Sequence, residues 1–239
     1  MEKHSWPKSI VLHLLPGLLV GLCYFILAPI VKQYGYPTVM ALVLSGILVL
    51  IPFEMGFLLY LSKKTGKKLI GEVVLYQKRL NIWQHILWVA VIFVLTGLLF
   101  KAFDFTSDLF MKFFSRIPSG YMLDMGLTED YTKTKLIISY ALFFLLIVVV
   151  LPTVEELYFR GYLLPRMPQN LKAFTGVVHS FLFAIYHVWT PWLIITRTFG
   201  VLPLIYIVKW KQNLYLGILA HCLINSIDFI IAVAFIMKM

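Results

Sequence analysis

Polar residues spaced four apart interrupt the apolar stretches in the last third of the chain. A carboxylate can activate water, while an imidazole or a carboxamide can hydrogen-bond to an oxyanion, and hydrolysis of a peptide bond needs both functions. The late polar motifs are Glu155-Glu156-x-x-x-Arg160, Phe183-x-x-x-His187 and His221-x-x-x-Asn225.

The first motif contains two acids with different helical directions. Glu156 and Arg160 lie four apart with the acid first, which is the favourable order for an ion pair on a helix. Glu155 points about 100° away from that pair, so it is the candidate general base. The alternative is that both acids and the arginine only neutralise one another at the membrane boundary.

The other two motifs have weaker chemistry when taken singly. His187 on its own is more typical of a satisfied core residue. His221 and Asn225 share one helix face and can point at one oxyanion, but membrane helices also use such residues as interhelical hydrogen bonds. Cys222 lies off that face, and we interpret it as a packing residue.

A metal site is the competing interpretation of the same residues. Glu155, His187 and His221 match the ligand set of a catalytic zinc ion, in which case Glu156, Glu54 or Asp228 would have to act as the base. We favour the version without a cofactor. The sequence has no His-Glu-x-x-His zinc helix and no Gly-x-Ser-x-Gly nucleophile turn.

These residues must be positioned by membrane helices. The 239 residues are 61% hydrophobic and 13% charged, with a mean hydropathy of +0.88. Such values exclude a soluble domain, a disordered chain and a disulfide-stapled module. The net charge of +10 indicates membrane topology and anionic lipid, not nucleic acid.

The hydropathy pattern predicts an all-α polytopic bundle of about seven transmembrane helices. Each span needs about 20 apolar residues. The expected spans are roughly 9–31, 37–61, 82–101, 136–159, 173–190, 192–209 and 213–237. Within 101–135, aromatic residues recur at helical spacing against charged ones, which predicts an amphipathic helix in the outer interface.

Basic residues concentrate on one side of this topology. The positive-inside rule therefore places the N-terminus and the 62–81 loop in the cytoplasm. The 13 basic residues on that side are Lys3, Lys8, Lys63, Lys64, Lys67, Lys68, Lys78, Arg79, Arg160, Arg166, Lys172, Lys209 and Lys211.

Several ionisable residues fall at bilayer depth, where they are costly and usually mark function. Counting about 1.5 Å per residue puts the polar groups of the three motifs roughly 13–24 Å from the cytoplasmic turns, so they can meet in one wet cavity. The ionisable residues are Glu54, Glu155, Glu156, Arg160, His187, Arg197, His221 and Asp228, with His13 and His179 as weaker candidates.

The ordered trio of motifs resembles the CPBP intramembrane proteases, also called the Abi or CAAX protease and bacteriocin-processing family. The resemblance covers about residues 136–230, which divides the chain into a variable 1–135 region and a catalytic core at 136–239. It implies seven or eight spans, with the site opening toward the cytoplasm. The implied base is Glu155, with His187 as its partner, His221 and Asn225 at the oxyanion, and Glu156 and Arg160 in support.

The sequence thus predicts an intramembrane endopeptidase acting on a membrane-associated peptide or protein, with a bacterial cell membrane as the expected location. The alternative is a non-catalytic binding or bacteriocin-immunity protein that uses the same polar cavity. A proton-coupled transporter using Glu54 and Asp228 is a third candidate, which the lack of an internal repeat disfavours.

Overall fold

The structure is a computed structural model that describes residues 2–114 and 116–239. Within these residues the chain forms helices and no strand, which agrees with the all-α prediction. The α-helices are α1 (Trp6–Gln33), α2 (Val39–Ser45), α3 (Ile51–Thr65), α4 (Ile82–Phe114), α5 (Lys133–Phe143), α6 (Leu151–Glu155), α7 (Leu164–Arg166), α8 (Thr175–Tyr186), α9 (Ile194–Gly200), α10 (Leu202–Lys211) and α11 (Leu214–Lys238).

Some of these helices are continuous with one another through π-helical segments. Segment η1 (Gly46–Leu50) joins α2 to α3, while η3 (Phe144–Val150) and η4 (Glu156–Leu163) lie on either side of α6. Short 3-10 turns occur at η2 (Ser119–Tyr121), η5 (Gln169–Phe174) and η6 (Pro191–Leu193). The joined helices form two long spans, Val39–Thr65 and Lys133–Arg166.

Five helices in the described residues are long and apolar enough to cross a membrane, or six if one bent pair counts as a span. The predicted count of seven is therefore not confirmed. The difference lies in 173–209: α8 has only 12 residues, and the segment after it is bent by 41° between Gly200 and Leu202. Twelve residues rise about 18 Å, well short of a bilayer core of about 30 Å.

The segment after the third predicted span also differs from expectation. α4 continues without a break to Phe114, so the first part of 101–135 extends this helix instead of forming a separate one. Thr106 and Ser107 are buried there, and both hydrogen-bond to Thr196 on α9. These hydrogen bonds to α9 explain why polar residues occur in this part of α4.

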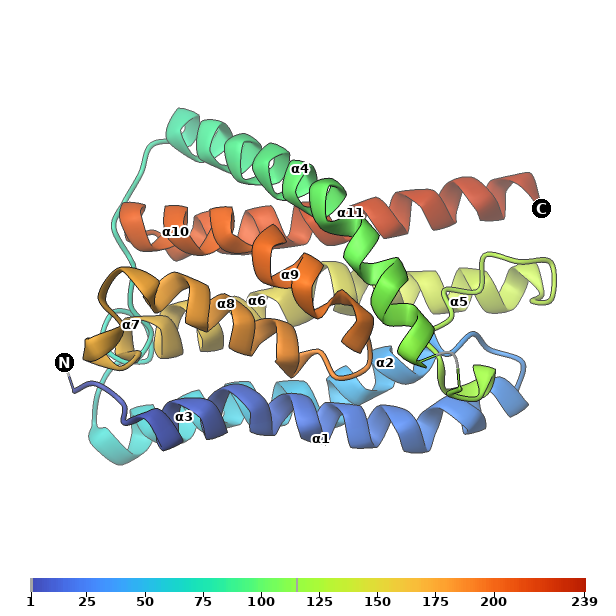
Figure 1. The fold of residues 1–239 in the computed structure, drawn as a ribbon, viewed down its shortest axis with the longest axis horizontal. Coiled ribbons are helices and arrows are strands. Elements are labelled where there is room, and N and C mark those ends of the chain that lie inside the picture. The colour runs from blue at the N-terminus through green and yellow to red at the C-terminus, as the bar shows by residue number, and fades with distance from the viewer. Residues whose placement is uncertain (1, 115) are drawn as a thin grey trace.

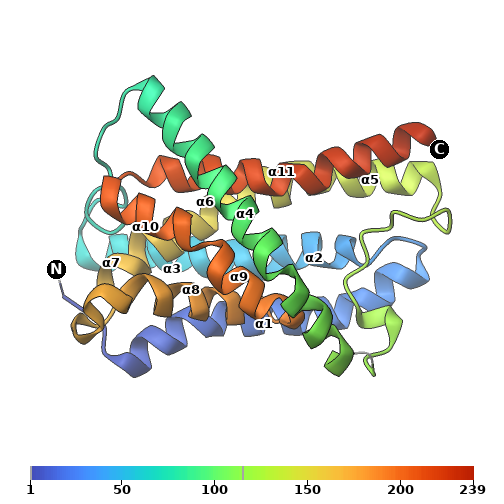
Figure 2. The same cartoon turned by 45° about the horizontal axis from the view of Figure 1, so that its top comes forward.

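The helices are stacked in rows (Figure 1). The row of α1, α2 and α3 lies along one side, α5 to α8 occupy the middle, and α10 and α11 lie on the other side. Figure 2 shows α4 crossing obliquely over α9, with which it packs closely. The middle row, which carries the first two motifs, is thus enclosed on both sides, and the third motif lies on α11 beside it.

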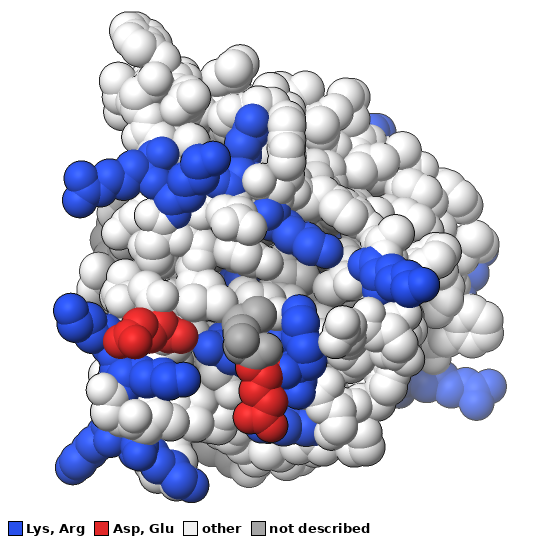
Figure 3. Space-filling view, turned by 90° about the vertical axis from the view of Figure 1, so that its left-hand side faces the viewer, with Lys and Arg blue, Asp and Glu red and all other residues white. Residues whose placement is uncertain are grey.

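The cytoplasmic loops predicted from the charge pattern gather at one end of the molecule, where the N-terminus lies (Figure 1). Lys3 Nζ donates to the carbonyl of Pro165, and the backbone N–H of Lys78 donates to the carbonyl of Gln212. Seen from this end, the surface carries many Lys and Arg side chains and few acids (Figure 3). The segments that the positive-inside rule grouped together are therefore adjacent in space.

Candidate active site

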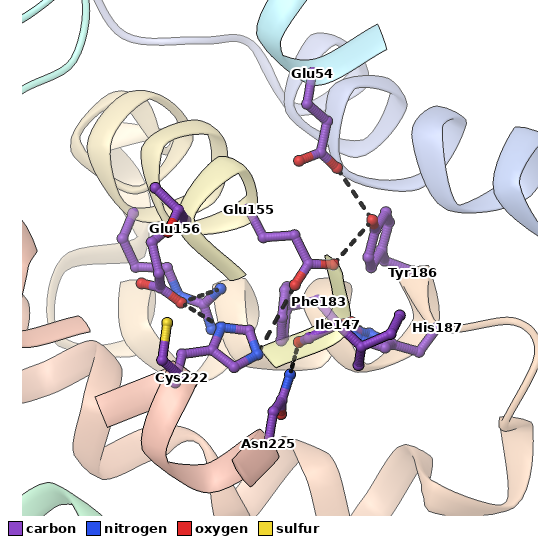
Figure 4. Close-up of polar contacts among 12 residues, drawn as sticks. Glu54, Ile147, Glu155, Glu156, Phe183, Tyr186, His187, Cys222 and Asn225 are labelled. Carbon is purple, nitrogen blue, oxygen red and sulfur yellow. Dashed lines mark hydrogen bonds and ion pairs between the residues drawn. The ribbon is translucent and has the colours of Figure 1, made fainter. Parts of the chain in front are cut away.

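The helix that carries Glu155 is shaped by a proline. In η3, the backbone N–H of Leu151 bonds to the carbonyl of Leu146, five residues back. The next bond in this register would come from residue 152, but Pro152 has no N–H, which leaves the carbonyl of Ile147 free. Asn225 Nδ2 on α11 donates to that carbonyl over 2.8 Å (Figure 4). The π segment thereby ties α11 to the helix of the first motif.

Glu156 and Arg160 form the ion pair that their spacing predicts. Arg160 Nη1 lies 3.2 Å from Glu156 Oε1, and both side chains are buried. The same carboxylate oxygen accepts a hydrogen bond of 3.0 Å from His221 Nδ1. The Arg160 guanidinium also stacks 3.9 Å from the centre of the Phe183 ring. Glu156 therefore holds and orients the imidazole of His221.

Glu155 points away from that pair, as expected, and its two oxygens have different neighbours. Its Oε1 accepts a hydrogen bond of 3.1 Å from the hydroxyl of Tyr186, and its Oε2 lies 3.8 Å from His221 Nε2. His221 is thus placed between Glu155 and Glu156. Sequence reasoning paired His221 with Asn225 and did not foresee this bridging position.

Two further side chains complete the group around Glu155. Tyr186 is fully buried, and its hydroxyl also lies 3.1 Å from Oε1 of Glu54 on α3 (Figure 4). Glu54 was noticed as a charge at bilayer depth, but its link to Glu155 was missed. Tyr186 gave no signal because an aromatic residue before His187 is ordinary in an apolar helix.

His187 lies where α8 ends and has one nitrogen committed. Its Nδ1 hydrogen-bonds to the carbonyl of Phe183 over 2.8 Å, so Nδ1 carries the proton. The neutral ring is then an acceptor at Nε2. This nitrogen can accept a hydrogen bond from water, whereas the neutral ring cannot donate to an oxyanion.

The motifs open on a common cavity of about 680 Å³. Its remaining wall is largely apolar, which is typical of a pocket in which a few polar groups orient a ligand. The polar residues that line it include Glu155, Arg160, His187, Arg197, His221, Asn225 and Asp228. The structure therefore brings all three motifs to one site, with Asp228 beside them.

Arg197 adds a second cation to this cavity. Its Nη2 donates to Thr190 Oγ1 over 3.0 Å, while its buried Nη1 has no hydrogen-bond partner among the described residues. Sequence reasoning named no partner for it. An arginine that lines a cavity and has an unpartnered donor is suited to binding an anionic group.

Two other buried histidines, His13 and His179, pair with each other. His13 Nε2 and His179 Nδ1 hydrogen-bond to each other over 2.8 Å, which links α1 to α8.

Across the described residues, no three His, Cys, Asp or Glu side chains are grouped so that they could hold a metal ion. The alternative zinc set of Glu155, His187 and His221 is thus not assembled in this arrangement.

An apolar helical bundle with buried acids, imidazoles and a cavity defines an integral membrane protein with an intramembrane polar site. Comparison with protein families names the group: residues 137–227 match the family described as Type II CAAX prenyl endopeptidase Rce1-like. This match agrees with the resemblance to the CPBP or CAAX protease family that the ordered motifs predict. No curated protein and no solved structure matches the chain significantly.

Proposed function

We propose that the protein is an intramembrane endopeptidase that hydrolyses a peptide bond in a membrane-associated peptide or protein. The observation that carries the proposal is the position of Glu155. One of its oxygens is held by Tyr186, and the other faces His221 beside the cavity. The family that residues 137–227 match supports a protease.

In the proposed reaction, Glu155 accepts a proton from a water molecule while that water attacks the substrate carbonyl carbon. Nε2 of His187 accepts a hydrogen bond from the same water and orients it. Glu155 then transfers the proton to the leaving amine nitrogen as the carbon–nitrogen bond breaks. A dry bundle interior strengthens these electrostatic interactions.

In this proposal, His221 and Asn225 donate hydrogen bonds to the oxyanion. Since the Nδ1 proton of His221 is donated to Glu156, its Nε2 can donate to the oxyanion only when Nε2 also carries a proton. Asn225 uses one amide N–H for Ile147 and retains the other. A single N–H from each residue is thus left for the oxyanion.

We infer that the end rich in Lys and Arg faces the cytoplasm of a bacterial cell. The N-terminus and the loop at 62–81 lie at this end, and basic loops are retained on the cytoplasmic side. The substrate then approaches from the cytoplasmic side or laterally from lipid. Epitope tags on residue 66 and on the C-terminus, probed with a membrane-impermeant reagent, test this orientation.

The decisive experiment measures cleavage by purified protein in lipid vesicles. A fluorogenic prenylated CAAX peptide is the first probe, and mass spectrometry of membrane-associated peptides extends the search to native substrates. Glu155→Gln and His221→Ala are expected to lower kcat at least about 100-fold. Cys222→Ser, one residue along α11, is the matched control and is expected to cleave at the parental rate.

Retained cleavage in Glu155→Gln or His221→Ala would overturn the assignment. Protection of cells by all variants without any cleavage product would instead favour the binding or immunity function. Metal analysis of the active preparation, with activity measured after chelation, decides between the metal-free mechanism and a bound zinc ion.

A further inference from the structure

The hydroxyl of Tyr186 is shared by two buried carboxyl groups. It lies 3.1 Å from Oε1 of Glu54 and 3.1 Å from Oε1 of Glu155. A phenol has a single hydrogen to donate. If both acids were ionised, one of these contacts would be an oxygen facing a carboxylate with no proton between them, which is repulsive in a buried site.

One of the two acids must therefore supply a hydrogen to the phenol oxygen. Glu155 lines the cavity, and its Oε2 lies 3.8 Å from His221 Nε2. Glu54 is fully buried, forms no ion pair within the described residues, and its Oε2 has no hydrogen-bond partner there. A neutral carboxyl fits the surroundings of Glu54, whereas an ionised one would be left almost unsolvated.

We propose that Glu54 is a positioning residue that acts as a protonated acid and sets the direction of the Tyr186 hydrogen bond. Glu54 donates its O–H to the Tyr186 oxygen, and Tyr186 then donates its own hydrogen to Oε1 of Glu155. The inference rests on the proposed role of Glu155 as the water-activating base.

The chain of hydrogen bonds has a defined effect on Glu155. Its Oε1 is occupied by Tyr186, so Oε2 is the oxygen left to accept a proton from water on the side of His221. Glu54 lies far outside the matched residues 137–227, on α3 in the region before residue 136. That region thereby contributes a residue that orients the catalytic group.

The first test is independent of substrate. Infrared spectra of the protein in lipid vesicles at neutral pH are compared between the parent and Glu54→Gln, in H2O and D2O. The parent is expected to show a carbonyl band of a protonated carboxyl group that shifts in D2O and is absent in Glu54→Gln. Tyr186→Phe should move this band, because its hydrogen-bond acceptor is lost.

The second test measures cleavage of the fluorogenic prenylated CAAX peptide. Glu54→Gln keeps a donor of the same shape and is expected to retain kcat within about 3-fold. Glu54→Leu and Tyr186→Phe remove the chain and should each lower kcat about 10-fold or more at unchanged KM. The double variant Glu54→Leu with Tyr186→Phe should be no slower than Tyr186→Phe alone, because both substitutions remove the same hydrogen-bond chain.

Met55→Leu is the matched control for a change on the same turn of α3, and thermal melting in detergent reports on folding. Identical infrared spectra of parent and Glu54→Gln would overturn the proposal, as would a loss of kcat in Glu54→Gln equal to that in Glu54→Leu. If the parent cleaves nothing, the proposed function fails, while the infrared result still decides whether Glu54 is protonated.

Discussion

His221 shows how a single residue depends on charges that are themselves buried. Its Nδ1 is held by Glu156, and Glu156 in turn neutralises Arg160. Glu156 therefore orients the His221 ring and also balances the charge of Arg160. Replacing it should therefore affect stability as well as turnover.

Glu156→Gln is expected to destabilise the protein by about 3–5 kcal/mol, because it leaves the Arg160 guanidinium buried without its counter-ion. Thermal or denaturant unfolding in detergent measures the change. The double replacement Glu156→Leu with Arg160→Met removes both charges and should recover much of the loss. An unaltered unfolding midpoint in Glu156→Gln would show that the ion pair contributes little.

Arg197 makes a prediction about the substrate. Because its Nη1 is free beside the cavity, a peptide with an ionised carboxyl group near the cleaved bond should bind more tightly than its amide. Arg197→Gln is expected to reduce this preference about 10-fold, which is roughly 1.4 kcal/mol. The ratio of kcat/KM for paired acid and amide peptides measures it, and equal loss for both peptides would contradict it.

At the scale of helices, the site depends on a break in regular hydrogen bonding. Pro152 leaves the carbonyl of Ile147 without a helical donor, and Asn225 satisfies it from α11. The site also requires a close approach of α11 to the first motif, and a glycine, Gly217, lies at the point of approach. A Cβ at this position would lie 2.6 Å from Glu156 Oε2.

The Pro152–Asn225 link can be tested by a double-mutant cycle. Asn225→Ala should cost about 1–3 kcal/mol in the parent, because it leaves a buried carbonyl unsatisfied. In a Pro152→Ala background the restored N–H can satisfy Ile147, so Asn225→Ala should then cost less. Unfolding free energies of the four proteins measure the coupling, and equal costs in both backgrounds would refute it.

Gly217→Ala should displace the Glu156 carboxylate and with it the His221 ring. Since a misplacement of about 1 Å in an active site can cost roughly 100-fold, kcat is expected to fall by 10-fold or more. Gly56→Ala on α3 is the matched control, because a Cβ there meets nothing within 4 Å. Parental kcat in Gly217→Ala would mean that α11 shifts without disturbing the motif.

At the scale of the whole molecule, the N-terminal segment is hydrogen-bonded to a later segment at the end that is rich in Lys and Arg. The backbone N–H of His4 donates to the carbonyl of Arg166, and the His4 ring is buried. Burial, together with the positive charges of Lys8 and Arg166, lowers the pKa of His4 from 6.5 to about 4. The folded segment therefore holds this ring in its neutral form.

Protonation of His4 should favour release of this segment. Because the pKa is lower in the folded state, the stabilisation by His4 is complete above pH 6.5 and is lost as the pH falls toward about 4. Melting temperatures of the parent and His4→Asn across this range measure the effect. The parent should lose more stability on acidification than the variant, and parallel curves would contradict the prediction.

The sequence predicted the meeting of the three motifs better than it predicted the span count. The four-residue spacing of Glu156 and Arg160 is a local property of a helix, and the structure confirms their ion pair. Hydropathy could not distinguish a full span from the 12-residue α8, since both are apolar. The partnership of Glu54 with Tyr186 depends on helix packing across 132 positions of the chain, which no local pattern records.

The shortness of α8 also bears on how a hydrolase obtains its reactant. Each bond cut consumes one molecule of water, and hydrocarbon dissolves almost none. Where α8 stops, irregular backbone follows at 187–190, and such backbone is tolerated at membrane depth only inside protein or along a hydrated space. His187, Trp189 and Thr190 border the cavity there. The early end of α8 thus leaves irregular backbone, and no helix wall, beside the cavity that Glu155 lines.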